Sequence, residues 1–364
     1  MPIVDLDAIG FPSVADLSRA YFAGSLRDSV SKVFNEAHLC PEPLEYIRFF
    51  QMIMRPTWAL PYTTRSSDFP KLRDGLLKVL EKANARIVLY PLHEAVKDEN
   101  VIRLSWHTMG RKPQRWHYKV AYLPHMLHFD RDGYSGWSEL YRTDRRVIQK
   151  IPAPLADSYF ETLTKEYSEA RISKYRQPQA AAIEAEDFVF VPLQLPNDGV
   201  IQLKLFPQPY LEGMGQAIAS LLARGLRVVV KRHPNCRDKA VEQFLNSFDS
   251  PLFQVSKAAI HDLIPKSRCV VTLNSGVGFE SLLYMRPVVC LGKADYSLAG
   301  KECADPTAIP EAVEAAIREL DPGFVLKVVF AAHNIYQLDI RSELASEQQV
   351  LRALCWNFIE KAER

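Results

Sequence analysis

Three short segments of this sequence carry side chains capable of chemistry, and each directly follows an apolar, strand-forming run. The first, residues 194–199 (QLPNDG), holds Gln194 and the carboxylate of Asp198. A carboxylate in this place could act as a nucleophile, a base or a sugar ligand. Its structural alternative is a turn in which Asp198 accepts a backbone hydrogen bond, and the sequence by itself leaves both open.

The second segment is cationic. Lys231, Arg232 and His233 end a valine-rich run, and Pro234 fixes the turn that follows. Two cations and an imidazole are unfavourable to bury unless an anion meets them, and a nucleotide phosphate would satisfy all three. A His-Pro pair is also common in ordinary loops.

The third segment lies where a strand is followed by a helix. Asn274, Ser275 and Gly276 are small or polar residues that permit close backbone approach, and the free N–H groups of a helix start suit a phosphate. Glu280, one turn into the helix, could accept hydrogen bonds from a ribose or a base. The alternative is a capped helix in which Glu280 complements the helix dipole.

Strands and helices must alternate to place these segments. Apolar runs predict strands at residues 188–194, 226–232, 269–273 and 287–291, and helical spacing predicts helices at residues 213–224, 239–247 and 277–284. This rhythm is typical of a parallel sheet covered on both faces, which binds ligands at the carboxyl ends of its strands. The first half is less regular, with strands predicted at residues 85–90 and 100–106 and a helix at 70–85.

Length and composition set the frame. The 364 residues suit two α/β domains, and 48% hydrophobic with 24% charged residues is typical of a globular protein. We divide the chain within its polar, helical stretch at 142–186, whose basic run 171–176 is interpreted as a solvated face. The prediction is an acceptor-side domain over 1–186, a donor domain over 187–335, and a C-terminal helix within 336–364 that packs back on the first domain.

Several function classes are disfavoured. Forty-five basic and 43 acidic residues give a net charge of +2, which offers no electrostatic case for a nucleic acid partner. The six cysteines are scattered without metal-ligand spacing, and the predicted donor domain has no DxD pair of the kind that holds a metal for a sugar nucleotide, so we expect no metal and no cofactor. Neither a membrane-spanning tract nor a signal peptide is found, which favours a cytoplasmic location.

The ordered motifs carry a family resemblance. LQLPNDG (193–199), RHP (232–234) and TLNSGVGFESLLYMRPVVCLG (272–292) resemble the bacterial capsule polysaccharide synthesis proteins. They also resemble the related O-antigen lipopolysaccharide enzymes, which are retaining β-Kdo glycosyltransferases that use CMP-Kdo. In the N-terminal half, YLPHMLHFDRDGYSGWSEL (122–140) is similar to that family's acceptor-side motif.

The resemblance implies an α/β fold of the GT-B-like type, with two Rossmann-like domains facing a cleft and CMP-Kdo bound by the C-terminal one. It also implies a double displacement in which Asp198 is the nucleophile and His233 contacts the donor phosphate. The further donor-binding residues that it implies are Gln194, Lys231, Arg232, Asn274, Ser275, Gly276 and Glu280.

On the acceptor side the match implies roles for Lys119, Tyr122, Asp130, Tyr134 and Trp137. The chain departs from the family here, because related enzymes carry an acidic residue just before the Tyr-Leu pair, where this sequence has Lys119-Val120-Ala121. Glu139 is our substitute candidate for the catalytic acid/base. Its alternative is a solvent-facing residue after Trp137.

The expected partners are a nucleotide-sugar donor and a glycan or glycolipid acceptor, with peripheral association at the inner face of the inner membrane. The chain could also be one module of a larger protein or complex. Two other functions stay open: a CMP-sialic acid or UDP-sugar transferase of the same fold, and an inactive nucleotide- or glycan-binding partner in a polysaccharide assembly complex. An unrelated α/β protein is the third alternative.

Overall fold

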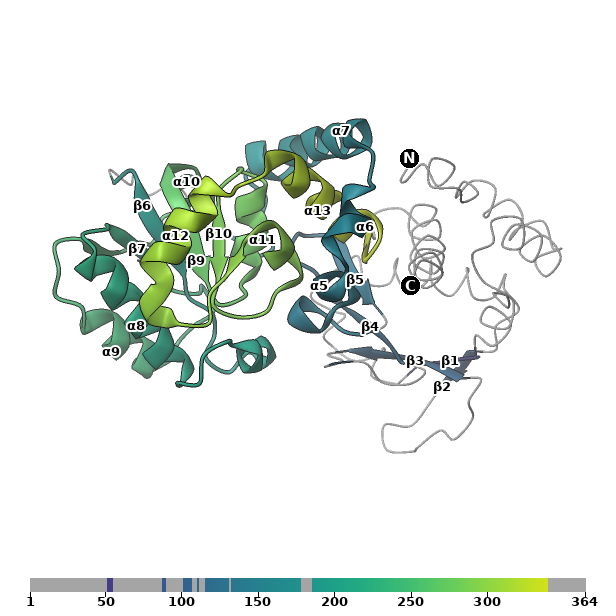
Figure 1. Cartoon of the computed structure of the whole chain (residues 1–364). Helices are drawn as coiled ribbons and strands as arrows, with labels where there is room; N and C mark the ends of the chain where they lie inside the picture. The colour runs from purple at the N-terminus through teal and green to yellow at the C-terminus, as the bar shows by residue number, and fades with distance from the viewer. Residues whose placement is uncertain are drawn as a thin grey trace. The chain divides into compact units, whose positions relative to one another are not determined.

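A computed structural model describes residues 51–54, 87–89, 101–106, 110, 115–130, 132–177 and 185–339 (Figure 1). The chain forms two compact units. Unit 1 consists of Met1–Ala121, His125–Ala156 and Phe330–Arg364, and unit 2 of Tyr122–Pro124 and Asp157–Val329. These divisions differ from the boundaries expected after residues 186 and 335, because the helical stretch from Asp157 onward packs with unit 2.

Unit 2 is built on a six-stranded parallel sheet with the strand order β11-β10-β9-β6-β7-β8. The central strands are runs of β-branched and aromatic residues that are buried throughout, as expected for a parallel sheet covered on both faces. The strands are β6 (Phe188–Pro192), β7 (Val228–Lys231), β8 (Phe253–Val255), β9 (Ser267–Thr272), β10 (Val288–Cys290) and β11 (Lys301–Glu302).

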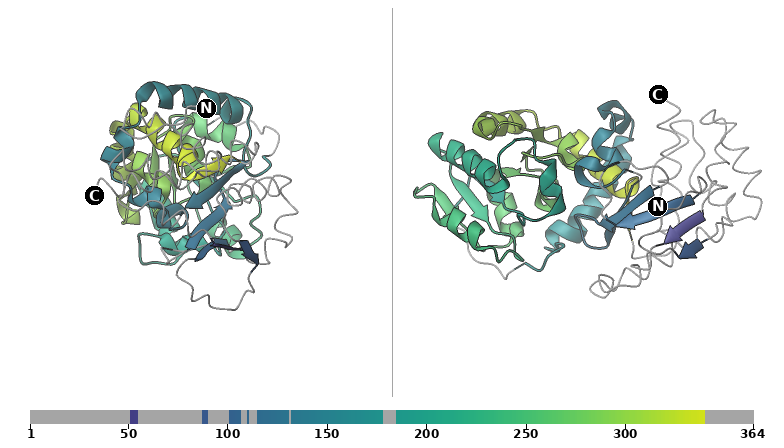
Figure 2. Two further views of the ribbon diagram at one scale, coloured as in Figure 1. Left: turned by 90° about the vertical axis from the view of Figure 1, so that its right-hand side faces the viewer. Right: turned by 90° about the horizontal axis from the view of Figure 1, so that it is seen from below.

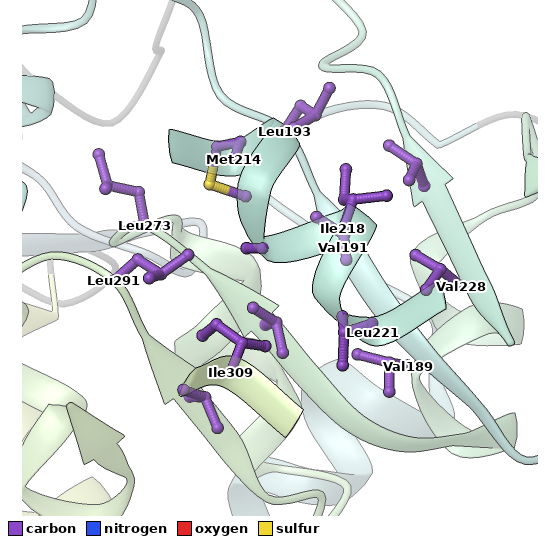
Figure 3. Close-up of a cluster of buried hydrophobic side chains, with 14 of the residues drawn as sticks. Val189, Val191, Leu193, Met214, Ile218, Leu221, Val228, Leu273, Leu291 and Ile309 are labelled. Atoms are coloured by element: carbon purple, nitrogen blue, oxygen red, sulfur yellow. The ribbon is translucent and has the colours of Figure 1, made fainter. Parts of the chain in front are cut away.

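Helices cover both faces of this sheet (Figures 1 and 2). Alternate strand residues such as Val189 and Val191 point to one face, where they pack against α8 (Tyr210–Ala223), α9 (Lys239–Asn246) and α12 (Ile309–Arg318). Figure 3 shows this core, with Ile218 and Leu221 of α8 lying over the strands. The opposite face is contacted by α10 (Ile260–Lys266) and α11 (Gly276–Leu282).

Unit 1 also contains a six-stranded sheet, in the order β12-β5-β4-β3-β1-β2. Its strands are β1 (Gln51–Met54), β2 (Ile87–Leu89), β3 (Val101–Trp106), β4 (Arg115–Val120), β5 (Met126–Asp130) and β12 (Gln337–Asp339). β1 to β4 are parallel, whereas β5 runs antiparallel to β4, and β12 runs antiparallel to β5. The helices of this unit that the structure describes include α5 (Glu139–Arg142) and α6 (Arg145–Gln149). Two boundaries between the units fall inside helices, one in α7 (Ala153–Leu163) and the other in α13 (Pro322–Asn334).

The predicted α/β fold of the GT-B-like class is confirmed, whereas the cleft between the domains stays a prediction. Every strand and helix predicted in residues 188–291 is present within a few residues of its expected bounds. β8 and α10 were not predicted, since β8 has three residues and α10 contains Pro265. The predicted helices at 70–85 and beyond residue 339 lie outside the described residues. None of the helices in the described ranges is long and apolar enough to span a bilayer.

Gly213 of α8 provides a test of this packing. A Cβ atom at Gly213 would lie 2.1 Å from Cε2 of Phe206, a ring that is itself buried in the core. We expect Gly213→Ala to lower the free energy of unfolding by about 1–3 kcal/mol, despite the better helix propensity of alanine, because the ring must move.

Urea denaturation of Gly213→Ala and Gly215→Ala would check this. At Gly215, in the same helix, the Cβ would lie 3.2 Å from Cε2 of the partly buried Phe244, so the matched variant should be close to neutral. Equal stability of the two variants would contradict the packing described.

Candidate functional site

The three segments singled out in the sequence directly follow three neighbouring strands of the unit 2 sheet, β6, β7 and β9. β6 lies between β7 and β9, with Pro192 opposite Lys231 on one side and Phe190 opposite Val270 on the other. Because the strands are parallel, the loops after all three begin at the same edge of the sheet. The predicted donor-binding segments are therefore neighbours in space.

Gln194 and Asn274 join two of these loops. Nε2 of Gln194 donates to Oδ1 of Asn274 at 2.9 Å, and the Asn274 backbone N–H donates to Oε1 of Gln194 at 3.0 Å. Nδ2 of Asn274 also donates to the carbonyl oxygens of Val200 at 2.9 Å and Lys293 at 3.3 Å. Both side chains are buried, so this pair fixes the loops that carry Asp198 and Ser275.

Asp198 is the N-cap of a 3-10 turn, Gly199–Leu203, and its Oδ1 accepts the N–H of Val200 at 3.2 Å. The turn role weighed in the sequence is thus real. The charge of the Asp198 carboxylate also affects the pKa values of two other residues, His233 and Tyr175. Burial lowers the pKa of His233 and the charge of Asp198 opposes that change, while burial and then Asp198 raise the pKa of Tyr175. The charge of Asp198 therefore acts on both Tyr175 and His233.

The cationic segment separates into different roles. Lys231 is 8% exposed and its Nζ donates to the Ala258 carbonyl at 2.6 Å, while an Arg232 Nη2 donates to the Asp238 carbonyl at 2.8 Å. Nδ1 of His233 accepts the Asn235 N–H at 3.1 Å, so the neutral imidazole carries its proton on Nε2.

The third segment begins α11. Oγ of Ser275 caps the helix by accepting the Val277 N–H at 3.3 Å. Glu280 is buried and accepts a hydrogen bond from Oγ of Ser173. Burial raises the pKa of Glu280 to about 8, against the opposing effect of the Ser173 hydrogen bond, so the carboxyl group is mainly protonated at neutral pH.

Tyr122, predicted on the acceptor side, belongs instead to unit 2. Its hydroxyl donates to Oδ1 of Asp295 at 2.6 Å, and its ring stacks on Phe279 with centroids 5.3 Å apart. A Cβ at Gly276 would lie 3.1 Å from Cδ1 of Tyr122, so a glycine allows this close approach. Burial raises the pKa of Asp295 to about 7, with the Tyr122 hydrogen bond opposing the rise.

Sequence reasoning missed residues 171–177, here named the strap. Its basic run was interpreted as a solvated face, yet four of its side chains contact other parts of unit 2. They are Arg171 with Asp262, Ser173 with Glu280, Tyr175 with His233, and Gln177 with the Ile260 N–H. No periodic pattern or motif in these residues signals such contacts.

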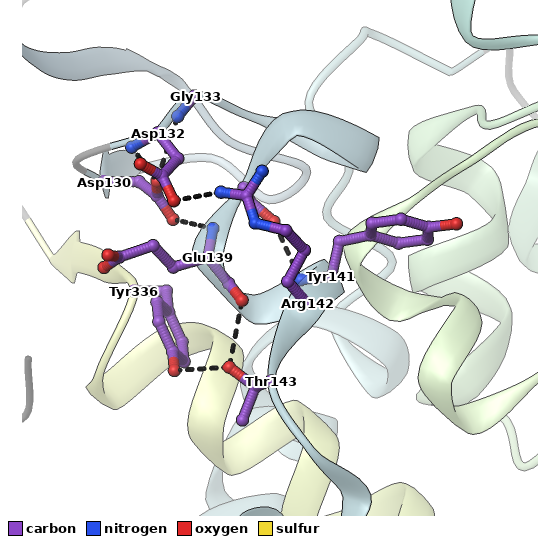
Figure 4. Close-up of polar contacts among 9 residues, drawn as sticks. Asp130, Asp132, Gly133, Glu139, Tyr141, Arg142, Thr143 and Tyr336 are labelled. Carbon is purple, nitrogen blue, oxygen red and sulfur yellow. Dashed lines mark hydrogen bonds and ion pairs between the residues drawn. The ribbon is translucent and has the colours of Figure 1, made fainter. Parts of the chain in front are cut away.

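In unit 1, Asp130 and Glu139 form a buried carboxyl pair (Figure 4). Oδ1 of Asp130 accepts the N–H groups of Asp132 at 2.6 Å and Gly133 at 2.9 Å, and its Oδ2 accepts the Glu139 N–H at 2.8 Å. Burial and the neighbouring Glu139 raise the pKa of Asp130. Glu139 is 5% exposed, so its interpretation as a solvent-facing residue is wrong.

The remaining acceptor-side residues lie around Tyr134. Nζ of Lys119 is 3.9 Å from the centroid of the Tyr134 ring, which is a cation–π contact, and Trp137 is tilted against the same ring at 5.3 Å. Lys119, Asp130, Tyr134, Trp137 and Glu139 therefore all belong to unit 1, whereas Tyr122 is assigned to unit 2. Over the residues that the structure describes, no group of three or more His, Cys, Asp or Glu could hold a metal ion.

The raised pKa of Glu280 predicts a pH dependence of stability. Its folded-state pKa of about 8 lies above the ordinary glutamate value. The contribution of Glu280 to the free energy of unfolding is therefore fully present below the ordinary glutamate pKa and is lost as the pH rises from there through about 8. Glu280→Gln has no such proton to lose. We expect this variant to gain stability relative to wild type between about pH 5 and 8, by at most about 1.4 kcal/mol per pH unit.

Urea midpoints measured across this pH range would check the prediction. Glu314→Gln, at an exposed position of α12, is the matched control and should show no such trend. A stability difference for Glu280→Gln that does not change with pH would contradict the buried, protonated carboxyl group.

Comparisons with known proteins agree with this architecture. The solved structure described as "Thermosulfurimonas dismutans KpsC, beta Kdo 2,4 transferase" matches with a TM-score of 0.51 and 16% identity, and the match covers 84% of this chain and 98% of that one. The beta Kdo 2,7 transferase of the same KpsC matches with the same TM-score and identity, covering 84% and 99%. At this identity the likeness concerns the fold.

A search of curated proteins finds no match. The family model described as "Capsule polysaccharide biosynthesis protein" matches residues 142–318, which contain all three loops at the edge of the unit 2 sheet. Over these residues, the chain is similar to the capsule polysaccharide biosynthesis protein family.

Proposed function

We propose that this protein is a glycosyltransferase that moves Kdo from CMP-Kdo to a bacterial surface glycan with retention of configuration. The observation that carries the proposal is that Asp198 and His233 follow the adjacent parallel strands β6 and β7 at one edge of the sheet, where the charge of Asp198 acts on the pKa of His233. A carboxylate beside a neutral imidazole combines a nucleophile with a phosphate-binding donor. The match of residues 142–318 to the capsule family and the fold similarity to KpsC support the same reaction class.

The donor is proposed to bind along the loops after β7, β6 and β9. Nε2–H of His233 would donate to the phosphate, since Nδ1 is already occupied by the Asn235 N–H. Glu280, mainly protonated, can both donate and accept hydrogen bonds, which suits the hydroxyl and amide groups of a nucleoside. Gln194 and Asn274 would act by holding the loops in place, because their amide groups already bond to each other.

The chemistry proceeds in two displacements. A carboxylate oxygen of Asp198 forms a bond to the anomeric carbon while the bond from that carbon to the phosphate oxygen breaks, and CMP leaves with the electron pair. The acceptor hydroxyl then loses its proton to a general base and attacks the same carbon, and the Asp198 carboxylate is released. Two inversions give net retention.

Glu139 remains our proposed acid/base. Its burial, and the hydrogen bond from its backbone N–H to Asp130, hold this carboxyl group in a fixed place away from bulk water. The acceptor is proposed to involve Lys119, Tyr134 and Trp137, since an aromatic and cationic cluster suits a sugar that carries negative charge.

Asp198→Asn is expected to abolish transfer, by at least about a thousandfold, with CMP affinity and melting temperature nearly unchanged. The amide can still accept the Val200 N–H but cannot attack carbon. Intact-protein mass spectrometry of wild type with CMP-Kdo and no acceptor should show an adduct of one sugar, which peptide mapping places on residues 194–199.

Asp238→Asn is the matched control, because Asp238 also caps a helix, α9, through the N–H of Ala240. It should retain activity. An adduct on another residue, or Asp198→Asn that turns over near the wild-type rate, would refute the assignment.

The donor itself can be tested by calorimetry with CMP, UDP and GDP. We expect CMP to bind at least tenfold more tightly than the other two. Preference for UDP would favour a UDP-sugar transferase, and tight CMP binding without any cleavage of CMP-Kdo would favour an inactive partner of an assembly complex.

A further inference from the structure

The strap is fastened to unit 2 at both ends and in the middle. Its ends attach to α10, where Nη2 of Arg171 lies 2.8 Å from Oδ2 of Asp262 and Oε1 of Gln177 accepts the Ile260 N–H at 3.2 Å. Between these attachments, the strap reaches the two residues proposed to bind opposite parts of the donor.

Two side chains make these central contacts. Oγ of Ser173 donates to Oε2 of Glu280, and the Tyr175 ring meets the His233 ring edge-on with centroids 4.9 Å apart. Glu280 follows β9 and His233 follows β7, and β6 separates these strands, so the two strand ends are roughly 10 Å apart. The strap therefore bridges the strand whose loop carries Asp198.

Lys174 is the residue between these two anchors. Its Nζ is 5.9 Å from the centroid of the Tyr175 ring, and the side chain is partly buried. Its charge reaches both neighbours: burial lowers the pKa of His233 and Lys174 lowers it further, whereas the burial that raises the pKa of Glu280 is opposed by Ser173 and then by Lys174. The ammonium group thus lies within electrostatic range of both.

We propose that Lys174 is an anion-binding residue of the nucleotide site, which contacts the phosphate together with His233, and that Ser173 and Tyr175 are its positioning residues. A flexible ammonium beside an N–H donor is a set suited to a phosphate, and the neighbouring Glu280 suits an uncharged nucleoside. The ligand class is a nucleoside monophosphate or its sugar ester. This inference rests on the proposed function, because that function supplies the nucleotide.

Calorimetry of the full chain with CMP and with cytidine would test the inference. Lys174→Met keeps the length of the side chain and removes the charge, so we expect CMP to bind at least tenfold more weakly and cytidine to bind as it does to wild type. The affinity of Lys174→Met for CMP should also depend less on salt concentration. Lys257→Met, at an exposed position of unit 2, should match wild type in every measurement.

A second readout needs no ligand. Because Lys174 lowers the pKa of His233, Lys174→Met should raise it, as followed by the ring resonances of His233 in NMR. Tyr175→Leu should move the same resonances, since the ring contact is lost, and should weaken CMP binding while leaving the melting temperature near that of wild type.

The outcomes separate the two proposals. If wild type binds no CMP, the proposed donor is wrong, and inorganic phosphate then serves as the probe. In that case phosphate should still shift the His233 resonances in wild type and Lys257→Met but not in Lys174→Met. Unchanged CMP affinity in Lys174→Met, or no effect of phosphate on His233 in wild type, would overturn the inference.

Discussion

The pairing of β6 with β7 on one side and β9 on the other is the constraint on which the candidate site depends. The three strands are parallel and buried, so their backbone groups must be satisfied within the sheet and their carboxyl ends must emerge together. The Gln194–Asn274 amide pair extends this pairing beyond the last strand residues. A carboxylate and an imidazole are thereby held on adjacent loops, and a buried acid on the helix that begins beside them.

Much of unit 2 could be predicted because its strands and helices follow simple patterns. Runs such as residues 188–192 are apolar and β-branched without interruption, and the segment after each run contains turn-forming or small residues. Parallel topology then brings Asp198, His233 and Glu280 to one edge without further information. The fold class and the choice of these three segments follow from that logic.

The direction of each side chain could not be predicted in the same way. Lys231 and Arg232 adjoin His233 in sequence. Their side chains nevertheless donate to the backbone carbonyl groups of Ala258 and Asp238, which lie 27 and 6 positions further along the chain. Tyr122 lies in a motif whose residues from His125 onward are in unit 1, and its contacts with Phe279 and Asp295 reveal its place in unit 2. Contacts of the strap likewise join residues about 60 to 110 positions apart, which no local pattern encodes.

The sheet of unit 1 is completed by β12, a strand at the end of the described chain. It pairs with β5, and Tyr336 just before it accepts the N–H of Phe129, so the edge of the sheet is completed by residues that follow the whole of unit 2. During synthesis, β5 must wait with one edge unpaired until some two hundred further residues have emerged, and exposed strand edges are sites of aggregation. A fragment that ends at residue 186 or 335 would lack β12 and would leave this edge of β5 without that partner.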